Sequence, residues 1–302
     1  MSIDLRPRRI ACLCTEAVEV LYALGEADRI AGISGFTVRP PQARREKPKI
    51  SGFSTGRLER ILAVEPDLVL AFSDLQADMC RDLIRAGIEV HVFNQRSIAG
   101  ILKMIVSVGA LVGRDSEAMT LVAGLQRGLD AARARGEARI ARHGRRLRVY
   151  FEEWDDPLIS GIRWVSELIE LAGGEDVFAE LRDCHSARDR RIEDPMTVVA
   201  RAPDLIIGSW CGKKFQPEHV RVRPGWGTVP AVAAGRLYEI KSPVILAPGI
   251  AALTDGLAEL ERCLDAAVAD PVRPRAEGGC RDRGSLAAAN PARDPVLNWQ
   301  QR

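Results

Sequence analysis

The chain has 302 residues, of which 46% are hydrophobic and 28% are charged, so it can bury a large core and is not mostly disordered. The 43 basic and 41 acidic side chains leave a net charge of +2, which argues against nucleic acid or an acidic membrane surface as the main partner. No stretch approaches the ~20 apolar residues that span a bilayer, so the protein is not expected to be membrane-embedded.

Two features of the sequence predict a cytoplasmic location. The first nine residues are charged and hold no apolar segment of roughly 7–15 residues, which a secretory signal would need. The seven cysteines are odd in number and include no CxxC pair, which favours free thiols in a reducing compartment. A periplasmic location is the alternative if the N-terminus is incomplete. The cysteines are Cys12, Cys14, Cys80, Cys184, Cys211, Cys263 and Cys280.

Strand and helix patterns alternate through residues 1–96, which we expect to form an N-terminal α/β lobe with a parallel sheet. Thr15 can cap the first helix and Gly25 ends it. The expected elements are a strand over 9–13, a helix over 15–24, a strand over 30–33, a helix over 57–64, a strand over 67–71, a helix over 76–86 and a strand over 89–93.

Residues 97–143 show helical periodicity only, with apolar residues at 98, 101, 102, 105, 108, 111 and 112. Gly113 breaks the pattern, and Asp115 or Ser116 can begin a second helix. We expect this segment to contain a long helix that bridges two lobes.

The α/β pattern returns over residues 144–269, which predicts a C-terminal lobe. Its expected elements are a strand over 147–151, helices over 164–172 and 194–200, strands over 205–208 and 237–240, and a helix over 249–267. Residues 270–302 are rich in Pro, Gly and Arg and are expected to be a disordered tail.

An internal echo supports two equivalent lobes. Residues 60–73 read RILAVEPDLVLAFS and residues 197–210 read TVVARAPDLIIGSW, at a constant offset of 137. Each is a helix end, a Pro-Asp turn and an apolar strand, in the same order in both halves.

Several short motifs, in this order and spacing, resemble those of one family. They are Thr15-Glu16 with LYALG at 21–25, RIAGI at 29–33, LERI at 58–61 with PDLV at 66–69, ELIELAGG at 167–174, ARAPD at 200–204, and Gly225-Trp226 with PAV at 230–232. The chain is similar to the class III, periplasmic-binding-protein-like substrate-binding proteins of ABC importers. These helical-backbone metal receptors include vitamin B12-, siderophore- and haem-binding proteins.

The resemblance implies an α/β fold of two Rossmann-like lobes joined by a long bridging helix, with a ligand cleft between the lobes. It implies a monomer that binds and delivers a metal chelate, has no enzymatic activity and works with an ABC permease. Family members dock on the permease through one acidic residue in each lobe. Glu59 matches the first, whereas the second falls near Met196, with Glu193 and Asp194 close by.

Two thiols are candidates for the ligand cleft. Cys14 and Cys211 each follow a predicted strand, one in each lobe, and thiolates are soft metal ligands. Cys14 also lies at a helix N-terminus, where the helix dipole lowers a thiol pKa. The alternative is that both are small buried apolar residues.

Aromatic and polar residues after strands are the other candidates for ligand contact. Trp210 could stack on a flat macrocycle, and Lys213 could meet a ligand carboxylate or phosphate, unless the loop holds a packed Trp and a solvated lysine. Phe53 lies where family members often place an aromatic residue over the ligand. Thr15, Glu153 and Trp154 follow strands as well, and Trp164 is either a ligand contact or a packed residue at a helix start.

These observations predict a binding protein for a metal chelate, either a cobalamin-like corrinoid or an iron complex. One alternative is a conventional ABC-importer substrate-binding protein. The other is a thiol-dependent metal- or cluster-binding protein or enzyme that uses Cys14 and Cys211.

Overall fold

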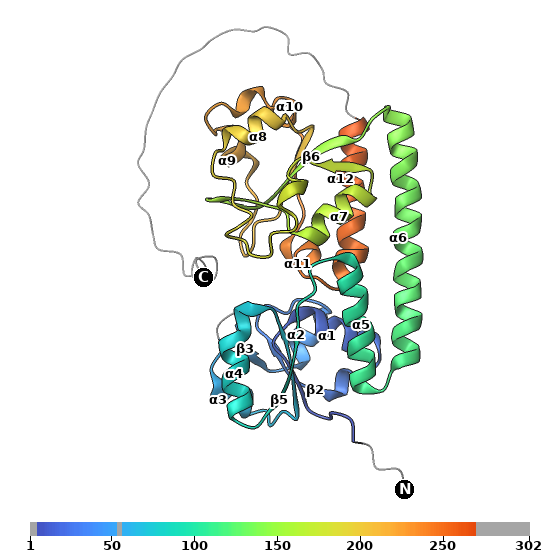
Figure 1. Cartoon of the computed structure of the whole chain (residues 1–302), viewed down its shortest axis with the longest axis vertical. Helices are drawn as coiled ribbons and strands as arrows, with labels where there is room; N and C mark the ends of the chain where they lie inside the picture. The colour runs from blue at the N-terminus through green and yellow to red at the C-terminus, as the bar shows by residue number, and fades with distance from the viewer. Residues whose placement is uncertain (1–4, 53–55, 270–302) are drawn as a thin grey trace.

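Two α/β lobes lie one above the other in the computed structural model, and a pair of helices runs beside them (Figure 1). The structure describes residues 5–52 and 56–269. The predictions for Phe53 and for the tail over 270–302 fall outside these residues. The α/β class and the two-lobed arrangement that the sequence predicts are confirmed.

The N-terminal lobe is built on a five-stranded parallel sheet with the order β3-β2-β1-β4-β5. Leu68, Leu70 and Phe72 point to one face of the sheet, and Val69 and Ala71 to the other, so both faces are buried. The elements are β1 (Ile10–Cys12), α1 (Thr15–Ala23), η1 (Ala27–Arg29), β2 (Ile30–Ser34), α2 (Pro41–Glu46), β3 (Lys49–Ser51), α3 (Leu58–Leu62), β4 (Leu68–Phe72), η2 (Asp74–Gln76), α4 (Ala77–Arg85) and β5 (Glu89–Phe93).

The C-terminal lobe has a mixed sheet with the order β10-β9-β6-β7, in which β8 also pairs with β6. Strand β6 is longer than predicted, because Glu152, Trp154 and Asp155 pair antiparallel with β7 instead of forming a turn. The elements are β6 (Leu147–Asp155), β7 (Leu158–Ser160), α7 (Arg163–Leu171), β8 (Gly174–Asp176), η3 (Ala179–Leu181), α8 (Met196–Arg201), β9 (Leu205–Gly208), α9 (Pro217–Arg221), η4 (Trp226–Thr228), α10 (Pro230–Ala233), β10 (Leu237–Glu239), α11 (Ser242–Ile245), η5 (Ala252–Gly256) and α12 (Leu257–Ala269).

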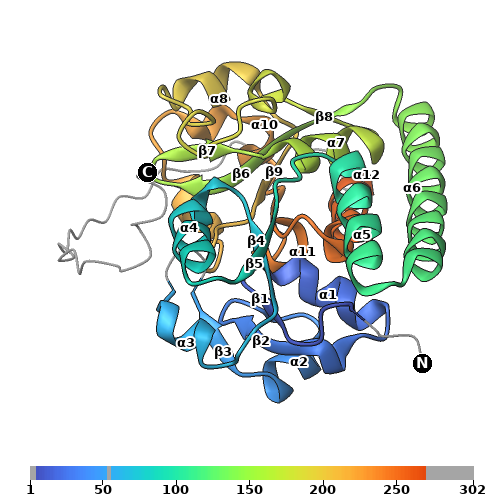
Figure 2. The same cartoon turned by 60° about the horizontal axis from the view of Figure 1, so that its bottom comes forward.

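Two helices, α5 (Ile98–Val112) and α6 (Asp115–His143), connect the lobes. The side chain of Ser97 accepts a hydrogen bond from the Gly100 N–H and caps α5, and Gly113 ends it with a φ of 69°. The 29 residues of α6 extend roughly 44 Å at 1.5 Å per residue. Figures 1 and 2 show α6 running along both lobes, as expected for the bridging helix.

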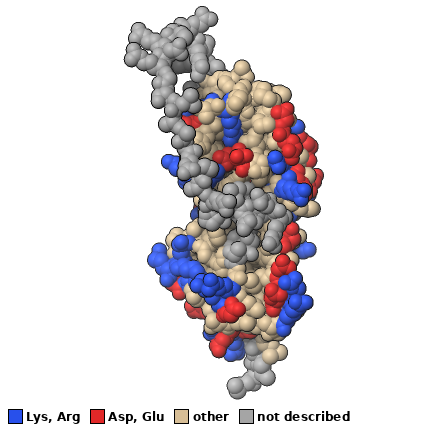
Figure 3. Space-filling model, turned by 90° about the vertical axis from the view of Figure 1, so that its left-hand side faces the viewer, with Lys and Arg blue, Asp and Glu red and all other residues tan. Residues whose placement is uncertain are grey.

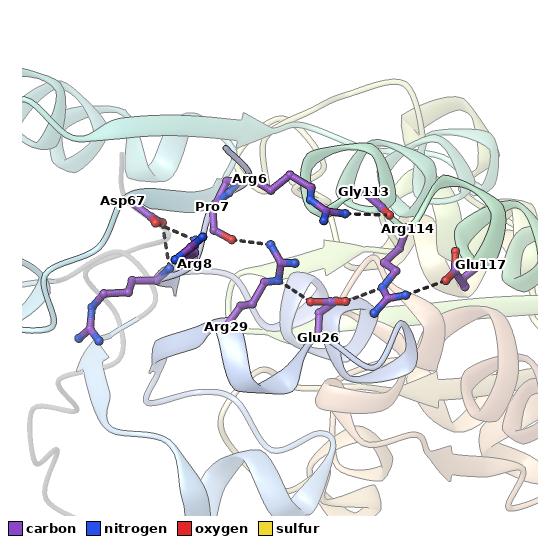
Figure 4. Close-up of polar contacts among 10 residues, drawn as sticks. Arg6, Pro7, Arg8, Glu26, Arg29, Asp67, Gly113, Arg114 and Glu117 are labelled. Carbon is purple, nitrogen blue, oxygen red and sulfur yellow. Dashed lines mark hydrogen bonds and ion pairs between the residues drawn. The ribbon is translucent and has the colours of Figure 1, made fainter. Parts of the chain in front are cut away.

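A buried carboxylate ties the N-terminal lobe to the turn between α5 and α6 (Figure 4). Glu26 accepts hydrogen bonds from Arg29 and from Arg114, which lies in that turn. Burial alone would raise the pKa of Glu26, but the two arginines lower it below its usual value. Arg29 also donates to the Pro7 carbonyl at 2.7 Å, so the start of the chain joins the same network.

The C-terminal lobe packs closely on the other end of α6. A Cβ on Gly136 would lie 2.6 Å from the Leu171 carbonyl oxygen, so the backbones of α6 and of the α7–β8 turn can touch only because glycine stands there. Arg139 pairs with Asp265 at 2.8 Å, which adds α12 to this contact. Both lobes are therefore fixed to the helical segment.

The repeated Pro-Asp turns occupy equivalent places in the two lobes. Asp67 precedes β4 and accepts hydrogen bonds from the backbone N–H groups of Arg8 and Arg9, just before β1. Asp204 precedes β9 and accepts a hydrogen bond from the Arg148 N–H, at the start of β6. Strands β4 and β9 pair with β1 and β6, so each turn holds together the two central strands of its sheet.

Charges of both signs are spread over the surface. On the face shown in Figure 3, Lys and Arg gather on part of the N-terminal lobe, while acidic and basic side chains are mixed elsewhere. Across residues 5–52 and 56–269, the structure contains no helix both long and apolar enough to cross a bilayer.

Candidate ligand site between the lobes

The loops that follow strands of the N-terminal sheet contact the C-terminal lobe. Gln95, two residues after β5, donates from its side-chain amide to the Pro248 carbonyl at 3.0 Å. The Ala251 N–H donates to Glu19 of α1, and Arg39 pairs with Asp255 at 2.7 Å. The carboxyl ends of parallel strands, where α/β proteins bind ligands, therefore face the other lobe.

Five polar residues from these loops and from the C-terminal lobe form what we call the interlobe cluster. Its members are Glu16, Gln95, Arg96, Glu153 and Arg190. The charges that act on the Arg96 guanidinium belong to groups of both lobes, which therefore lie within electrostatic range of it: Asp74, Arg190, Glu153 and Glu16. Burial is the largest influence on Arg96 and lowers its pKa.

Glu16, on the first turn of α1, is the most perturbed carboxyl of the interlobe cluster. Its side chain is 3% exposed, and its Oε1 has no hydrogen-bond partner among the described residues. Burial raises its pKa to about 7, despite the 3.1 Å hydrogen bond that its other oxygen accepts from the Thr15 hydroxyl. A Cβ on Gly249 would lie 2.7 Å from the Glu16 Cβ, so the C-terminal lobe approaches closely here.

Arg190 and Glu153 form a buried ion pair on the C-terminal lobe. The Arg190 guanidinium donates to the two carboxylate oxygens of Glu153 at 2.6 and 3.2 Å, and to the Ser160 carbonyl at 2.5 Å. Arg190 is 1% exposed, yet its Nε has no partner among the described residues. Taking such a pair out of water is costly, and the cost is offset only where further hydrogen bonds satisfy the remaining donors.

Both candidate thiols lie in this region, and the pKa of each is raised. Cys14 is 2% exposed and donates weakly to the Leu70 carbonyl at 3.8 Å. Burial raises its pKa well above the usual value and outweighs the helix N-terminus, so the predicted lowering is wrong. Burial and the nearby Glu153 carboxylate raise the pKa of Cys211 to about 11. Among the described residues, no three His, Cys, Asp or Glu side chains are placed to hold a metal ion.

Two tryptophans that the sequence suggested as ligand contacts, Trp210 and Trp154, are core residues. Trp210 is 2% exposed, packs edge-on against Phe215 at 4.9 Å and donates its indole N–H to Glu152 at 2.9 Å. Trp154 is also buried and donates to the Asp156 carbonyl. Other side chains of the lobe cover both rings, which agrees with the alternative that Trp210 is a packed residue.

Lys213 lies over these two indoles rather than free in solvent. Its ammonium is 4.2 Å from the centre of the Trp154 ring and pairs with Asp155 at 2.6 Å. Trp164 is buried at the start of α7 and donates to the Ile245 carbonyl at 2.8 Å, which agrees with the packing alternative. Thr15 is half-buried beside Glu16.

Three residues of the interlobe cluster could not be recognised as site residues from the sequence. Arg190 lies among Arg188, Asp189 and Arg191 in a loop whose composition is typical of a solvated turn, and its partner Glu153 is 37 positions away. Arg96 precedes a helix whose apolar face is the stronger pattern. Glu16 belongs to a family motif, but nothing in its neighbours indicated that it would be buried.

Two cavities lie outside the interlobe cluster. One of about 500 Å³ is lined by residues of α5, α6 and α7, including Leu102, Gln126 and Leu171. The other, of about 610 Å³, lies against α4 and β5 beside Ile84 and Val92. In the described part of the chain, neither cavity is lined by a residue of the interlobe cluster.

Comparison with known proteins places this architecture in a family. Residues 10–244 match the family model described as "Periplasmic binding protein". The chain belongs to this periplasmic binding protein family. Members of the family are binding proteins rather than enzymes.

The relatives of this periplasmic binding protein include proteins with stated ligands. A cobalamin-binding protein of Halobacterium salinarum is 27% identical over 210 residues, which cover 68% of this chain and 55% of the relative. This chain thus spans little more than half the length of that relative. An uncharacterised ABC transporter substrate-binding lipoprotein, YvrC of Bacillus subtilis, is 24% identical to this chain. The match covers 86% of this chain and 81% of that relative. A periplasmic haem-binding protein from Pseudomonas aeruginosa shares the fold, with a TM-score of 0.73, 17% identity, and coverage of 85% of this chain and 92% of that structure.

The family also corrects the predicted location. A cytoplasmic location is wrong, because the periplasmic binding protein family and a lipoprotein relative point to a place outside the cytoplasm. The thiols did not decide the question: burial raises the pKa of Cys12 to about 12 and of Cys211 to about 11. Such thiols hold little thiolate and react slowly, so they do not require a reducing compartment.

Proposed function

We propose that this protein binds a metal chelate, a corrinoid or an iron complex, between its two lobes and delivers it to an ABC permease. The observation that carries the proposal is the set of unpartnered polar atoms of the interlobe cluster. They are Glu16 Oε1, Gln95 Oε1, Arg96 Nε and Arg190 Nε, all buried and without a hydrogen-bond partner among the described residues. Buried polar groups are nearly always hydrogen-bonded in folded proteins, so a ligand is the natural partner for this group.

The relatives support the chemical class of the ligand. Their names include cobalamin-binding and haem-binding proteins, and both ligands are metal macrocycles. We propose that Thr15, Glu153 and Lys213 contribute polar contacts at the edge of the site, and that Cys14 and Cys211 line it as neutral thiols. This use of the thiols needs no metal–sulfur bond, in keeping with their raised pKa values.

Glu59 remains the proposed contact with the permease. It is exposed on α3, as a docking residue must be. In the C-terminal lobe, Met196 begins α8 and is 47% exposed, with the exposed Glu193 and Asp194 just before it. We propose that docking depends on Glu59 and on these two carboxylates together.

Binding is tested by titrating the purified protein with cyanocobalamin, haemin and a ferric hydroxamate, following absorbance and heat. We expect saturable binding of at least one chelate, weakened at least tenfold by Arg96→Gln. The matched control is Arg81→Gln, which changes an exposed arginine of α4. Failure of all three chelates to bind would contradict the proposal.

A further inference from the structure

One edge of the N-terminal lobe carries an excess of basic side chains. Residues 44–60 hold six basic and two acidic side chains, a net charge of +4 in a chain whose total is +2. Five of the six cations are exposed, and Lys47 is half-buried. We call these six residues the basic edge: Arg44, Arg45, Lys47, Lys49, Arg57 and Arg60.

The fold gathers these cations around β3, the strand at one end of the N-terminal sheet. Strand β3 carries Lys49, whose ammonium donates to the carbonyl of Arg44 in α2 at 2.6 Å. A bridge between Ser51 and Gly56 keeps the chain beside β3 before α3 begins. Figure 2 shows α2, β3 and α3 next to one another on this side of the lobe. The cations of the three elements therefore belong to one surface.

The cations of the basic edge are not neutralised by the protein. In residues 5–52 and 56–269, none of the six forms an ion pair with a carboxylate, and Arg44 donates to backbone carbonyls. Exposed arginines elsewhere are paired, such as Arg133 with Asp130. Neighbouring like charges repel one another, so a surface of this kind is stabilised by a partner of opposite charge.

The equivalent stretch of the C-terminal lobe has no such excess. Residues 181–197 lie 137 positions further on and hold four basic and four acidic side chains. Three of the four arginines pair with carboxylates, namely Arg182, Arg190 and Arg191. The unpaired positive charge is therefore a property of one lobe and not of the order of elements that the two lobes share.

We infer that the basic edge is a docking surface for an acidic segment of another protein. Such a segment can set carboxylates against the arginines, whose forked guanidinium groups fit them. It can also set a cation against Glu59, which lies on α3 between Arg57 and Arg60. This chain does not supply the segment, because residues 270–302 hold six basic and four acidic side chains.

A lipid surface fits the basic edge less well than a protein does. A uniformly anionic layer would repel Glu59 while it attracted the neighbouring arginines. Segments that lie on membranes also insert large apolar side chains. Among residues 44–52 and 56–60, no large apolar side chain is exposed: Ile50 is buried and Leu58 is half-buried.

The inference rests on the proposed function in one respect, which is that the acidic segment belongs to the ABC permease. Charge of opposite sign would then steer the N-terminal lobe to the permease and make association faster at low salt. Glu59 would add one contact of the opposite polarity within the same surface. Docking would differ between the lobes, since the C-terminal lobe offers Glu193 and Asp194 beside paired arginines.

Docking is measured by the fluorescence anisotropy of a labelled decaglutamate peptide, added to the purified protein without any chelate. The edge variant combines Arg45→Gln, Arg57→Gln and Arg60→Gln, which removes three exposed and unpaired cations. Flotation with vesicles of phosphatidylcholine and phosphatidylglycerol tests a lipid as the partner.

The matched control removes the same charge from arginines that already have a partner. It combines Arg133→Gln, Arg221→Gln and Arg262→Gln, each of which is exposed and ion-paired in the structure. Thermal melting verifies that both variants are folded.

We expect the peptide to bind the unaltered protein at ~10 mM salt and at least fivefold more weakly at ~100 mM, since the screening length falls from about 30 Å to about 10 Å. The edge variant should bind the peptide at least tenfold more weakly than the unaltered protein, and the control variant within threefold. The vesicles should not distinguish the edge variant from the unaltered protein.

Three outcomes would overturn the inference: no binding of the peptide at ~10 mM salt, equal weakening by the two variants, or vesicle binding that the edge variant abolishes. The last would assign the basic edge to a lipid. Each leaves chelate binding, and with it that part of the proposed function, intact. A protein that docks the peptide through the basic edge but binds no chelate would contradict the proposed function and leave this inference standing, with a partner other than the permease.

Discussion

The two lobes share the order of their strands but differ in the residues that their central strands bury. Strands β2-β1-β4-β5 of the N-terminal sheet correspond in order to β8-β6-β9-β10 of the C-terminal one, and the same Pro-Asp turn precedes β4 and β9. The central strand β1 holds apolar residues and a cysteine, whereas β6 also buries Glu152 and Glu153. Apolar periodicity and turns therefore set the order of the elements, and the two central strands differ in the charged residues that they bury.

Two neighbouring carboxylates of β6 are each paired with an arginine of the C-terminal lobe. Glu152 is fully buried and accepts from the guanidinium of Arg223 at 2.6 and 2.9 Å and from the Trp210 indole. Its neighbour Glu153 pairs with Arg190 of the interlobe cluster. Because β1 carries no charged residue that could form such a pair, we expect loss of charge to destabilise the central strand of the C-terminal sheet and not that of the N-terminal sheet.

Removal of Arg223 should have the largest effect. Arg223→Met leaves the Glu152 carboxylate buried with one remaining side-chain donor, and breaking a buried pair in this way costs about 3–5 kcal/mol. Urea unfolding measures the loss. The double variant Glu152→Leu with Arg223→Met removes both charges and should recover most of the stability.

The matched control for Arg223 lies in the N-terminal lobe. Arg81→Met removes an exposed arginine that pairs with Asp78 and Asp82, and we expect no resolvable change in unfolding. The contrast would not hold if Arg223→Met and Arg81→Met lowered the free energy of unfolding equally. It would also not hold if the double variant were no more stable than Arg223→Met.

The substitution Glu16→Gln should have the next largest effect on stability, and it should raise the free energy of unfolding rather than lower it. The folded-state pKa of Glu16, about 7, lies above the ordinary 4.5, so ionisation costs stability: the cost is absent below pH 4.5, grows as the pH rises to 7 and is then constant. The two pKa values correspond to about 3 kcal/mol as an upper bound. Glu16→Gln should therefore stabilise the protein at pH 8 and have little effect at pH 4. Urea unfolding at both pH values checks this, and equal effects at the two would contradict it.

The sequence was sufficient for the fold and insufficient for the site, for a physical reason. Strand β5 was predicted over the residues it occupies, because apolar periodicity and turns are local signals. Trp210 was misplaced because the sequence cannot tell an indole that stacks on a ligand from one that packs on Phe215. Arg190 escaped notice because its role depends on Glu153, which only the folded chain brings near.

The smallest effect should come from the two Pro-Asp turns, where the lobes are most alike. Asp204 is buried and receives two hydrogen bonds from Arg145, at 2.6 and 2.7 Å, while Asp67 is exposed and receives hydrogen bonds from backbone N–H groups. Burial alone would raise the pKa of Asp204, but Arg145 and the Arg148 N–H lower it. Asp204→Asn should cost about 1–2 kcal/mol at pH 7, since Arg145 is half-exposed and its charge is partly screened. Asp67→Asn keeps one acceptor oxygen and loses the other, so it should cost about 0.5–1 kcal/mol, the net contribution of one hydrogen bond.

The pH dependence of the stability of these two variants shows whether the charge of the aspartate contributes to each turn, or whether the two turns differ only in burial. A carboxylate with a lowered folded-state pKa contributes stability above its ordinary pKa and loses it as the pH falls through the folded value. The penalty of Asp204→Asn should therefore shrink between pH 7 and pH 3, as measured by urea unfolding at both values. A penalty that stays constant would mean that the turn is held by hydrogen bonds alone, whatever the charge of the side chain. The paired Arg145 would then add nothing that the exposed turn of the N-terminal lobe lacks.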